Sequence, residues 1–176
     1  MNIGSNRTIM KNALKASMIP ALQSKGFGGN YPHFRKDCAD HIELISFWTN
    51  KYGGSFTVEV SAVFPNRRDR NLIVDEALQD PGLNAAFTNE RYRLPGMFDG
   101  WFYYTDVYQK RTLRFGNLYY TPEGRTKAAP DASQGWRLAQ HFDEATALDI
   151  CNEVERQMEH AFIWLEKYVR KHQSKR

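Results

Sequence analysis

The chain of 176 residues is long enough for one well-buried core and short for two, so we expect a single domain spanning residues 1–176. Its 41% hydrophobic and 25% charged residues are typical of a soluble globular protein, and no apolar run approaches the roughly 18 residues of a membrane span. The start of the chain has no apolar signal core, and the two cysteines, Cys38 and Cys151, are too few for a disulfide framework. These features predict a cytoplasmic protein.

The net charge of +4 comes from the end of the chain. Five basic residues lie in the last ten positions, and the rest of the chain has 19 basic against 20 acidic residues. A nucleic-acid-binding domain normally carries its lysines and arginines on the folded surface that meets the phosphates. The distribution therefore predicts a frayed basic tail at 169–176 and disfavours a nucleic-acid partner.

The first segment with a clear period is 6–24, where apolar residues recur every three or four positions. This spacing predicts an amphipathic helix that ends at Gly26, with Phe27 folding back on the last turn. Pro20 lies inside this segment and cannot donate a hydrogen bond to residue 16. We therefore expect a kink there, or two short helices.

The next segment, 31–64, predicts a strand followed by a hairpin. Residues 42–48 are apolar at both parities, which is typical of a central strand. Residues 56–64 alternate between apolar and polar side chains, which predicts one core face and one solvent face. Gly53 and Gly54 stand where the chain must reverse, and glycine adopts positive φ without a Cβ clash.

The second half of the chain is less regular until its last helix. We expect a charged loop at 65–70, a short helix at 72–78, a turn at 80–82, strands at 91–94, 101–108 and 112–120, and a surface loop at 122–135. From Asp143, a good N-cap, apolar residues again return every three or four positions, which predicts a long helix covering a sheet. The expected core residues of that helix are Leu148, Cys151, Val154, Met158, Ala161, Phe162, Leu165 and Val169.

Together these elements predict an α+β fold, with a largely antiparallel sheet of roughly four to six strands packed mainly on one face by the two helices. Several short motifs resemble a bacterial family catalogued as domain of unknown function 4304. They are IPAL at 19–22, KGF at 25–27, PHFR at 32–35, NKYGGSF at 50–56, VE at 58–59, RYRL at 91–94, WF at 101–102 and WLE at 164–166. The resemblance implies a fold and a bacterial, cytoplasmic setting, and no mechanism.

One candidate cluster is a possible metal site. His33, Cys38 and His41 come close together in the sequence and offer imidazole and thiolate ligands. Their spacing matches no established zinc pattern, and the nearby Asp37 and Asp40 are common turn residues. We therefore expect no metal and no other cofactor.

A second cluster consists of charged residues on predicted strands, namely Arg35, Arg91 and Arg93 with Glu43 and Glu59. Converging in a cleft, they would suit proton transfer and the holding of an anionic substrate. Spread over a solvated face, they would form cross-strand ion pairs. Elsewhere, Asp143 and Glu144 near His141 fit a helix start, and nucleophile motifs and phosphate loops are absent, so no catalytic residue is predicted.

The aromatic segment, residues 92–120, holds ten of the 24 aromatic residues in the chain. Four of them are consecutive, so an alternating strand must direct two away from the core: Trp101, Phe102, Tyr103 and Tyr104. Exposed aromatic side chains stack bases, line pockets or anchor protein partners, whereas a core covered on both faces would bury them all. The leading hypothesis is a non-catalytic protein-interaction module of the adaptor or immunity type, acting on another protein or by self-association. A ligand binder or enzyme with an Arg/Glu-lined pocket comes second, and a single-stranded nucleic-acid binder third.

Overall fold

The computed structural model describes residues 3–51, 53–64, 80, 82–88, 90–97, 100–104, 119–121, 124–126 and 142–173. Its elements, in chain order, are α1 (Ile3–Ser24), β1 (Gly28–Asn30), β2 (His33–Asp37), β3 (Ile42–Thr49), β4 (Ser55–Val63), the 3-10 turn η1 (Ala85–Phe87), β5 (Arg91–Arg93), β6 (Phe102–Tyr103), β7 (Tyr119–Thr121), β8 (Gly124–Thr126) and α5 (Glu144–Gln173). No helix among these residues is long and apolar enough to cross a membrane.

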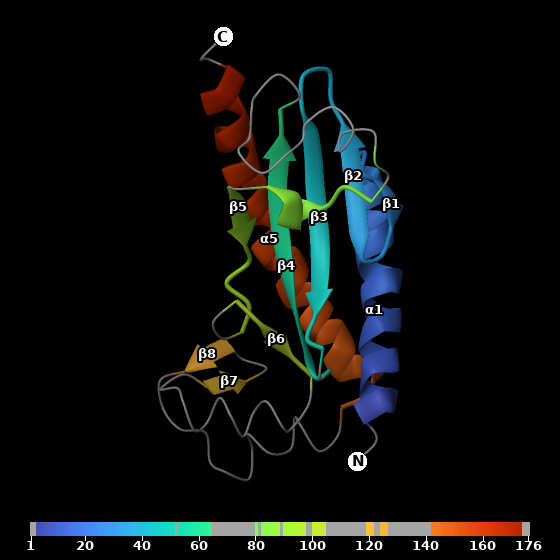
Figure 1. Ribbon diagram of the computed structural model, residues 1–176. Coiled ribbons are helices and arrows are strands. Elements are labelled where there is room, and N and C mark those ends of the chain that lie inside the picture. The colour runs from blue at the N-terminus through green and yellow to red at the C-terminus, as the bar shows by residue number, and fades with distance from the viewer. Residues whose placement is uncertain are drawn as a thin grey trace.

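Six strands form one antiparallel sheet in the order β1-β2-β3-β4-β5, with β6 pairing with β4, while β7 and β8 pair with each other. Both long helices lie behind this sheet in the view of Figure 1, and their buried side chains share one apolar core with the inner face of β3 and β4. The predicted α+β fold, with an N-terminal and a long C-terminal helix on an antiparallel sheet, is therefore confirmed.

Helix α1 ends as its sequence predicts. Gly26 adopts a positive φ of 85°, and the backbone N–H groups of Phe27 and Gly26 donate to the carbonyls of Leu22 and Gln23 at 3.0 and 2.9 Å. This is the Schellman arrangement, and it turns the buried Phe27 back toward the helix. Pro20 lies inside one continuous helix, so the expected division into two helices is wrong, and the kink stays a prediction.

The hairpin of β3 and β4 is the predicted one. Gly53 and Gly54 have φ values of 78° and 79°, and the N–H of Asn50 donates to Ser55 O at 2.9 Å to close the loop. Strand β3 lies inside the sheet, as its apolar sequence indicates.

The prediction of a solvent face on β4 is wrong, because every residue from Ser55 to Val63 is buried. The outer face carries the polar residues of this strand, and it is covered from two directions. Leu83, just before η1, packs with Ile42, Leu44 and Val63 in a second small core. From the side, Arg91 and Arg93 of β5 form ion pairs with Glu59. A period-two pattern reports which face is polar, but it does not report what covers that face.

The second half of the chain confirms the short strand at 91–94 as β5. Of the strand predicted at 101–108, the structure shows β6 at Phe102–Tyr103, and of 112–120 it shows the start of β7 at Tyr119. Within the predicted surface loop 122–135, Gly124–Thr126 forms β8. The predictions for 65–70, 72–78 and the rest of 105–135 lie outside the described residues.

The long helix α5 begins at its predicted cap, because Oδ1 of Asp143 accepts from the Thr146 N–H at 2.8 Å. Leu148, expected in the core, is 53% exposed, and Ala147 and Ile150 are buried instead. Within the predicted tail 169–176, the helix continues to Gln173 and buries Val169 and His172.

Candidate functional site

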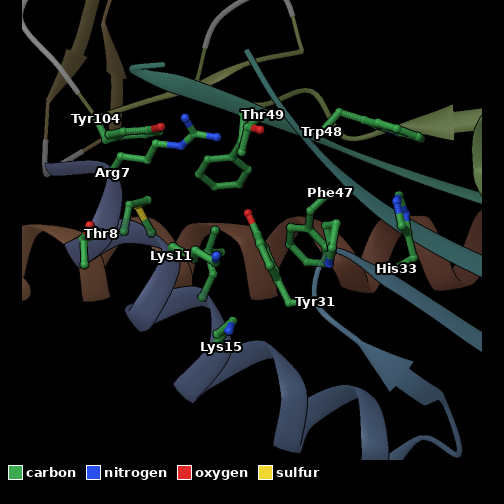
Figure 2. Close-up of a pocket in the computed structure, with 14 residues that line it drawn as sticks. Arg7, Thr8, Lys11, Lys15, Tyr31, His33, Phe47, Trp48, Thr49 and Tyr104 are labelled. Atoms are coloured by element: carbon green, nitrogen blue, oxygen red, sulfur yellow. The ribbon is translucent and has the colours of Figure 1, made fainter. Parts of the chain in front are cut away.

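A cavity of about 490 Å³ lies between α1 and the sheet, next to the β1–β2 connection and the start of β4 (Figure 2). Its floor is apolar and aromatic. The floor residues are buried side chains from α1, β3, β4 and the end of β6: Met10, Leu14, Phe47, Phe56 and Tyr104. This volume falls in the range of small-molecule sites, roughly 300–1,000 Å³.

The rim of the cavity is basic. Arg7, Lys11 and Lys15 are four residues apart on α1, so they share one helix face, and all three are exposed. None of the ion pairs among the described residues involves them. No aspartate or glutamate is among the fourteen residues that line the cavity. Within the described part of the chain, the cavity therefore carries positive charge that no lining carboxylate neutralises.

Tyr31 stands in the middle of the cavity, between the α1 cations and the ring of Phe47, whose centroid is 5.6 Å from its own (Figure 2). Burial, together with the neighbouring Tyr104, raises the pKa of Tyr31 to about 12, although Arg7 acts in the opposite direction. The phenol therefore stays protonated at neutral pH and can donate a hydrogen bond to an anion.

His33 and Trp48 form the far end of the cavity. Their ring centroids are 5.1 Å apart, and Nδ1 of His33 lies 3.1 Å from the hydroxyl of Ser46. Burial lowers the pKa of His33, so this imidazole is neutral at pH 7. The positive charge of the cavity is thus concentrated on its α1 side.

The structure brings together only part of the predicted Arg/Glu cluster. Oε1 of Glu59 lies 2.7 Å from Nη2 of Arg93 and 3.2 Å from Nε of Arg91, as the cross-strand alternative predicts. Arg35 pairs with Asp37 at 2.6 Å on β2, and β3 lies between that strand and Glu59. Glu43 pairs across the hairpin with Lys36 at 3.2 Å.

The four consecutive aromatic residues alternate as a strand requires. Phe102 and Tyr104 are buried, with Phe102 stacked on Phe56 at 5.1 Å, whereas Trp101 and Tyr103 are half-buried. Tyr104 is the member that lines the cavity. This segment therefore supplies one wall of the cavity as well as two partly accessible rings.

The residues weighed as metal ligands divide into two groups. His33 lies at the other end of β2 from Cys38, where it borders the cavity beside Trp48 (Figure 2). Among the described residues, Cys38 and His41 instead come together with Glu43, with one donor atom from each within 4.8 Å of the others. Asp143, expected at a helix start, is the α5 cap described above, and hydrogen bonds from Thr146 lower its pKa. His141 lies outside the described residues.

Sequence reasoning missed the cations of the cavity, although their four-residue spacing was visible. A lysine on an exposed helix face has no distinguishing mark until the structure shows which surface it borders. The two tyrosines that line the cavity, Tyr31 and Tyr104, come from segments far apart in the chain, and no local sequence pattern relates them.

The fold and site define this protein as an α+β domain with one helical layer and a basic cavity at its helix–sheet junction. Residues 18–90 match the family model described as Domain of unknown function (DUF4304), so the resemblance to that family is confirmed for this part of the chain. The matched residues include β1 to β4, but Arg7, Lys11 and Lys15 precede them. No curated protein and no solved structure matches the chain significantly.

Proposed function

We propose that this protein is a binding module for a small anionic molecule with a flat apolar part, held in the cavity between α1 and the sheet. The observation that supports this function best is the placement of three cations along one rim of an aromatic cavity. Among the described residues, these cations form no ion pair and no carboxylate lines the cavity. A carboxylate or phosphate meeting Lys11 or Lys15 gains charge-assisted hydrogen bonds.

The cations are an unfavourable arrangement for the helix alone. Like charges four residues apart destabilise a helix by about 0.2–0.5 kcal/mol per pair. In α1, Arg7 lies four residues before Lys11, and Lys15 lies four residues after Lys11. The first turn of the helix holds no acidic residue. An anionic ligand removes this repulsion, while its apolar part packs against the half-buried ring of Tyr31.

The experiment is a calorimetric titration with phenyl phosphate, benzoate and octanoate, and with benzyl alcohol and 1-octanol as uncharged analogues. At least one anion is expected to bind, more weakly at high salt because exposed charges are screened. Lys11→Gln removes one charge-assisted contact, so its binding should weaken at least about tenfold.

The matched control is Lys167→Gln, which removes an exposed lysine from α5 that does not line the cavity. Its affinity should equal that of the parent protein. The proposal is wrong if no anion binds, if the uncharged analogues bind equally well, or if the two lysine variants lose affinity to the same extent.

A second candidate is the non-catalytic protein-interaction module of the adaptor or immunity type. The half-buried Trp101 and Tyr103 favour it, since both flank buried aromatic residues and retain accessible area. Capture experiments with the parent protein and with Trp101→Ser test it, with sedimentation to detect self-association. A captured partner that Trp101→Ser loses, with the melting temperature retained, would support this function over the first.

A further inference from the structure

We infer that Cys38, His41 and Glu43, at the turn between β2 and β3, form a binding site for one Zn²⁺ ion. Their thiol, imidazole and carboxylate groups each contribute one donor atom, and these atoms lie within 4.8 Å of one another. None of the three lines the cavity of the proposed function, so this site is independent of that proposal.

The hairpin holds the three donors in place. Cys38 and His41 border a tight turn, which the Cys38 N–H closes by donating to His41 O at 2.9 Å. His41 and Glu43 are two residues apart at the start of β3, so their side chains project on the same side of the strand. Buried His41 also stacks on Phe64, with 5.6 Å between ring centroids, which fixes the plane of its imidazole.

The hydrogen bonds of His41 are those of a metal ligand. Asp40 Oδ1 lies 2.7 Å from Nδ1, which assigns the proton of a neutral imidazole to Nδ1. The lone pair on Nε2 then faces Oε1 of Glu43 at 3.4 Å, so two acceptors oppose each other. A cation between them resolves this conflict, and a carboxylate on the remote nitrogen is the usual support of a zinc-bound histidine.

Zn²⁺ is the ion that this mixed donor set suits. Thiolate, imidazole and carboxylate are its common ligands, at about 2.0–2.3 Å, whereas Mg²⁺ and Ca²⁺ prefer oxygen alone. Tetrahedral donors are about 3.5 Å apart at these bond lengths, so the three groups need to close by roughly 1 Å. The side chain of Cys38 is only partly buried and can supply this movement. With three protein ligands, a fourth position stays open.

Lys36 is the competitor of the metal. Its Nζ lies 3.2 Å from Oε2 of Glu43, while the oxygen that faces His41 is Oε1. A lysine ammonium and a zinc ion share this carboxylate at a cost in charge repulsion. Lys36→Gln is therefore expected to tighten zinc binding, an effect that a purely structural ion pair would not produce.

The test is a calorimetric titration of tag-free, chelator-treated protein with zinc chloride, supported by cobalt spectra for thiolate coordination. One zinc per chain is expected, together with protection of the Cys38 thiol from alkylation, since Cys151 is buried and a burial-raised pKa of about 12 keeps it unreactive. Cys38→Ser and Glu43→Gln should each weaken binding at least about 100-fold, and Asp40→Asn about 10- to 100-fold.

The matched controls are His33→Gln, on the same strand pair, and His160→Gln, on the exposed face of α5. Both should bind zinc like the parent protein. His41→Gln changes a buried residue and disturbs folding as well as zinc binding, so substitution of the partly exposed Cys38 is the primary test. The inference is overturned if the parent binds no zinc, if Cys38→Ser binds equally well, or if a control variant loses the site. In those cases Asp40 and Glu43 are only hydrogen-bond partners of His41.

Discussion

The two faces of β4 are both buried, but by different chemistry. Its inner face carries Phe56, Val58 and Val60 and packs into the apolar core under α1 and α5. Its outer face carries polar residues that include Thr57 and Glu59, covered by the segment around η1 and by the arginines of β5. The inner face is held by apolar area, whereas the outer face depends on whether each polar group finds a partner.

That difference matters because the outer face is only partly satisfied. Ser46 is well bonded, since its hydroxyl accepts from the Ala85 N–H at 3.1 Å and lies 3.1 Å from His33. Four other buried polar atoms have no hydrogen-bond partner among the described residues: Trp48 Nε1, Ser55 Oγ, Thr57 Oγ1 and Ser61 Oγ. Each such group costs on the order of 1–3 kcal/mol. Within the described part of the chain, the polar groups of the outer face are therefore less well satisfied than the apolar groups of the inner face.

The largest expected effect comes from β6, which continues both faces. Phe102 pairs with Phe56 on the inner face, and Tyr103 pairs with Ser55 on the outer face. Phe102→Ser should lower the free energy of unfolding by about 3–5 kcal/mol, because a fully buried ring is lost. Tyr103→Ser should cost about 1 kcal/mol, since its ring is half-buried.

Urea denaturation of the two variants measures this difference directly. If Tyr103→Ser costs as much as Phe102→Ser, the aromatic residues are core on both faces. The candidate protein-interaction function would then lose the accessible rings that support it.

The next effect concerns the buried carboxylate of the outer face. Arg91→Ala combined with Arg93→Ala leaves Glu59 without its two cations. The expected loss is about 2–3 kcal/mol, less than for a fully buried pair, because both arginines are partly exposed to water. Arg156→Ala on α5 breaks an exposed pair with Glu153 and should cost less than about 1 kcal/mol. Equal losses in the two experiments would show that burial of Glu59 adds nothing.

A smaller effect is expected from the turn between β3 and β4, which determines which side chains of β4 lie on its inner face and which on its outer face. A register slip of one residue in β4 would exchange its two faces, and Gly53 and Gly54 set that register. Valine at either position forces a β-branched residue to a φ near 78°, which should cost about 1–3 kcal/mol. Thermal melting checks this, with Ser55→Ala as a control next to the turn. The idea fails if both glycine variants melt with the parent.

The sequence was sufficient for the hairpin, the end of α1 and the start of α5, because each has a local cause. Alternating apolar and polar residues predict strand β4. The need for a positive φ explains Gly53 and Gly54, and the capping hydrogen bond of Asp143 explains where α5 begins. The covering of the outer face was not predictable, since Leu83 and Arg93 come from segments more than twenty residues away from the outer-face residue Glu59. For the same reason, the spacing of Lys11 and Lys15 was readable but the cavity they border was not. The sequence grouped His41 with His33 and Cys38, and it did not show that Glu43 is the third donor or that Asp40 lies beside Nδ1 of His41.

The smallest effect is the sharpest comparison, because it exchanges two nearly isosteric residues at adjacent positions on opposite faces. Thr57 and Val58 are both buried, at 2% and 0% exposure. Thr57→Val removes a hydroxyl that has no partner among the described residues, so the free energy of unfolding should stay the same or rise by up to about 1 kcal/mol. Val58→Thr, the matched control, places a hydroxyl in the apolar core and should cost about 1–3 kcal/mol. Urea denaturation of both variants gives the two signs. A clear loss in Thr57→Val would show that its hydroxyl is hydrogen-bonded in solution, and the outer face would then be as well satisfied as the inner one.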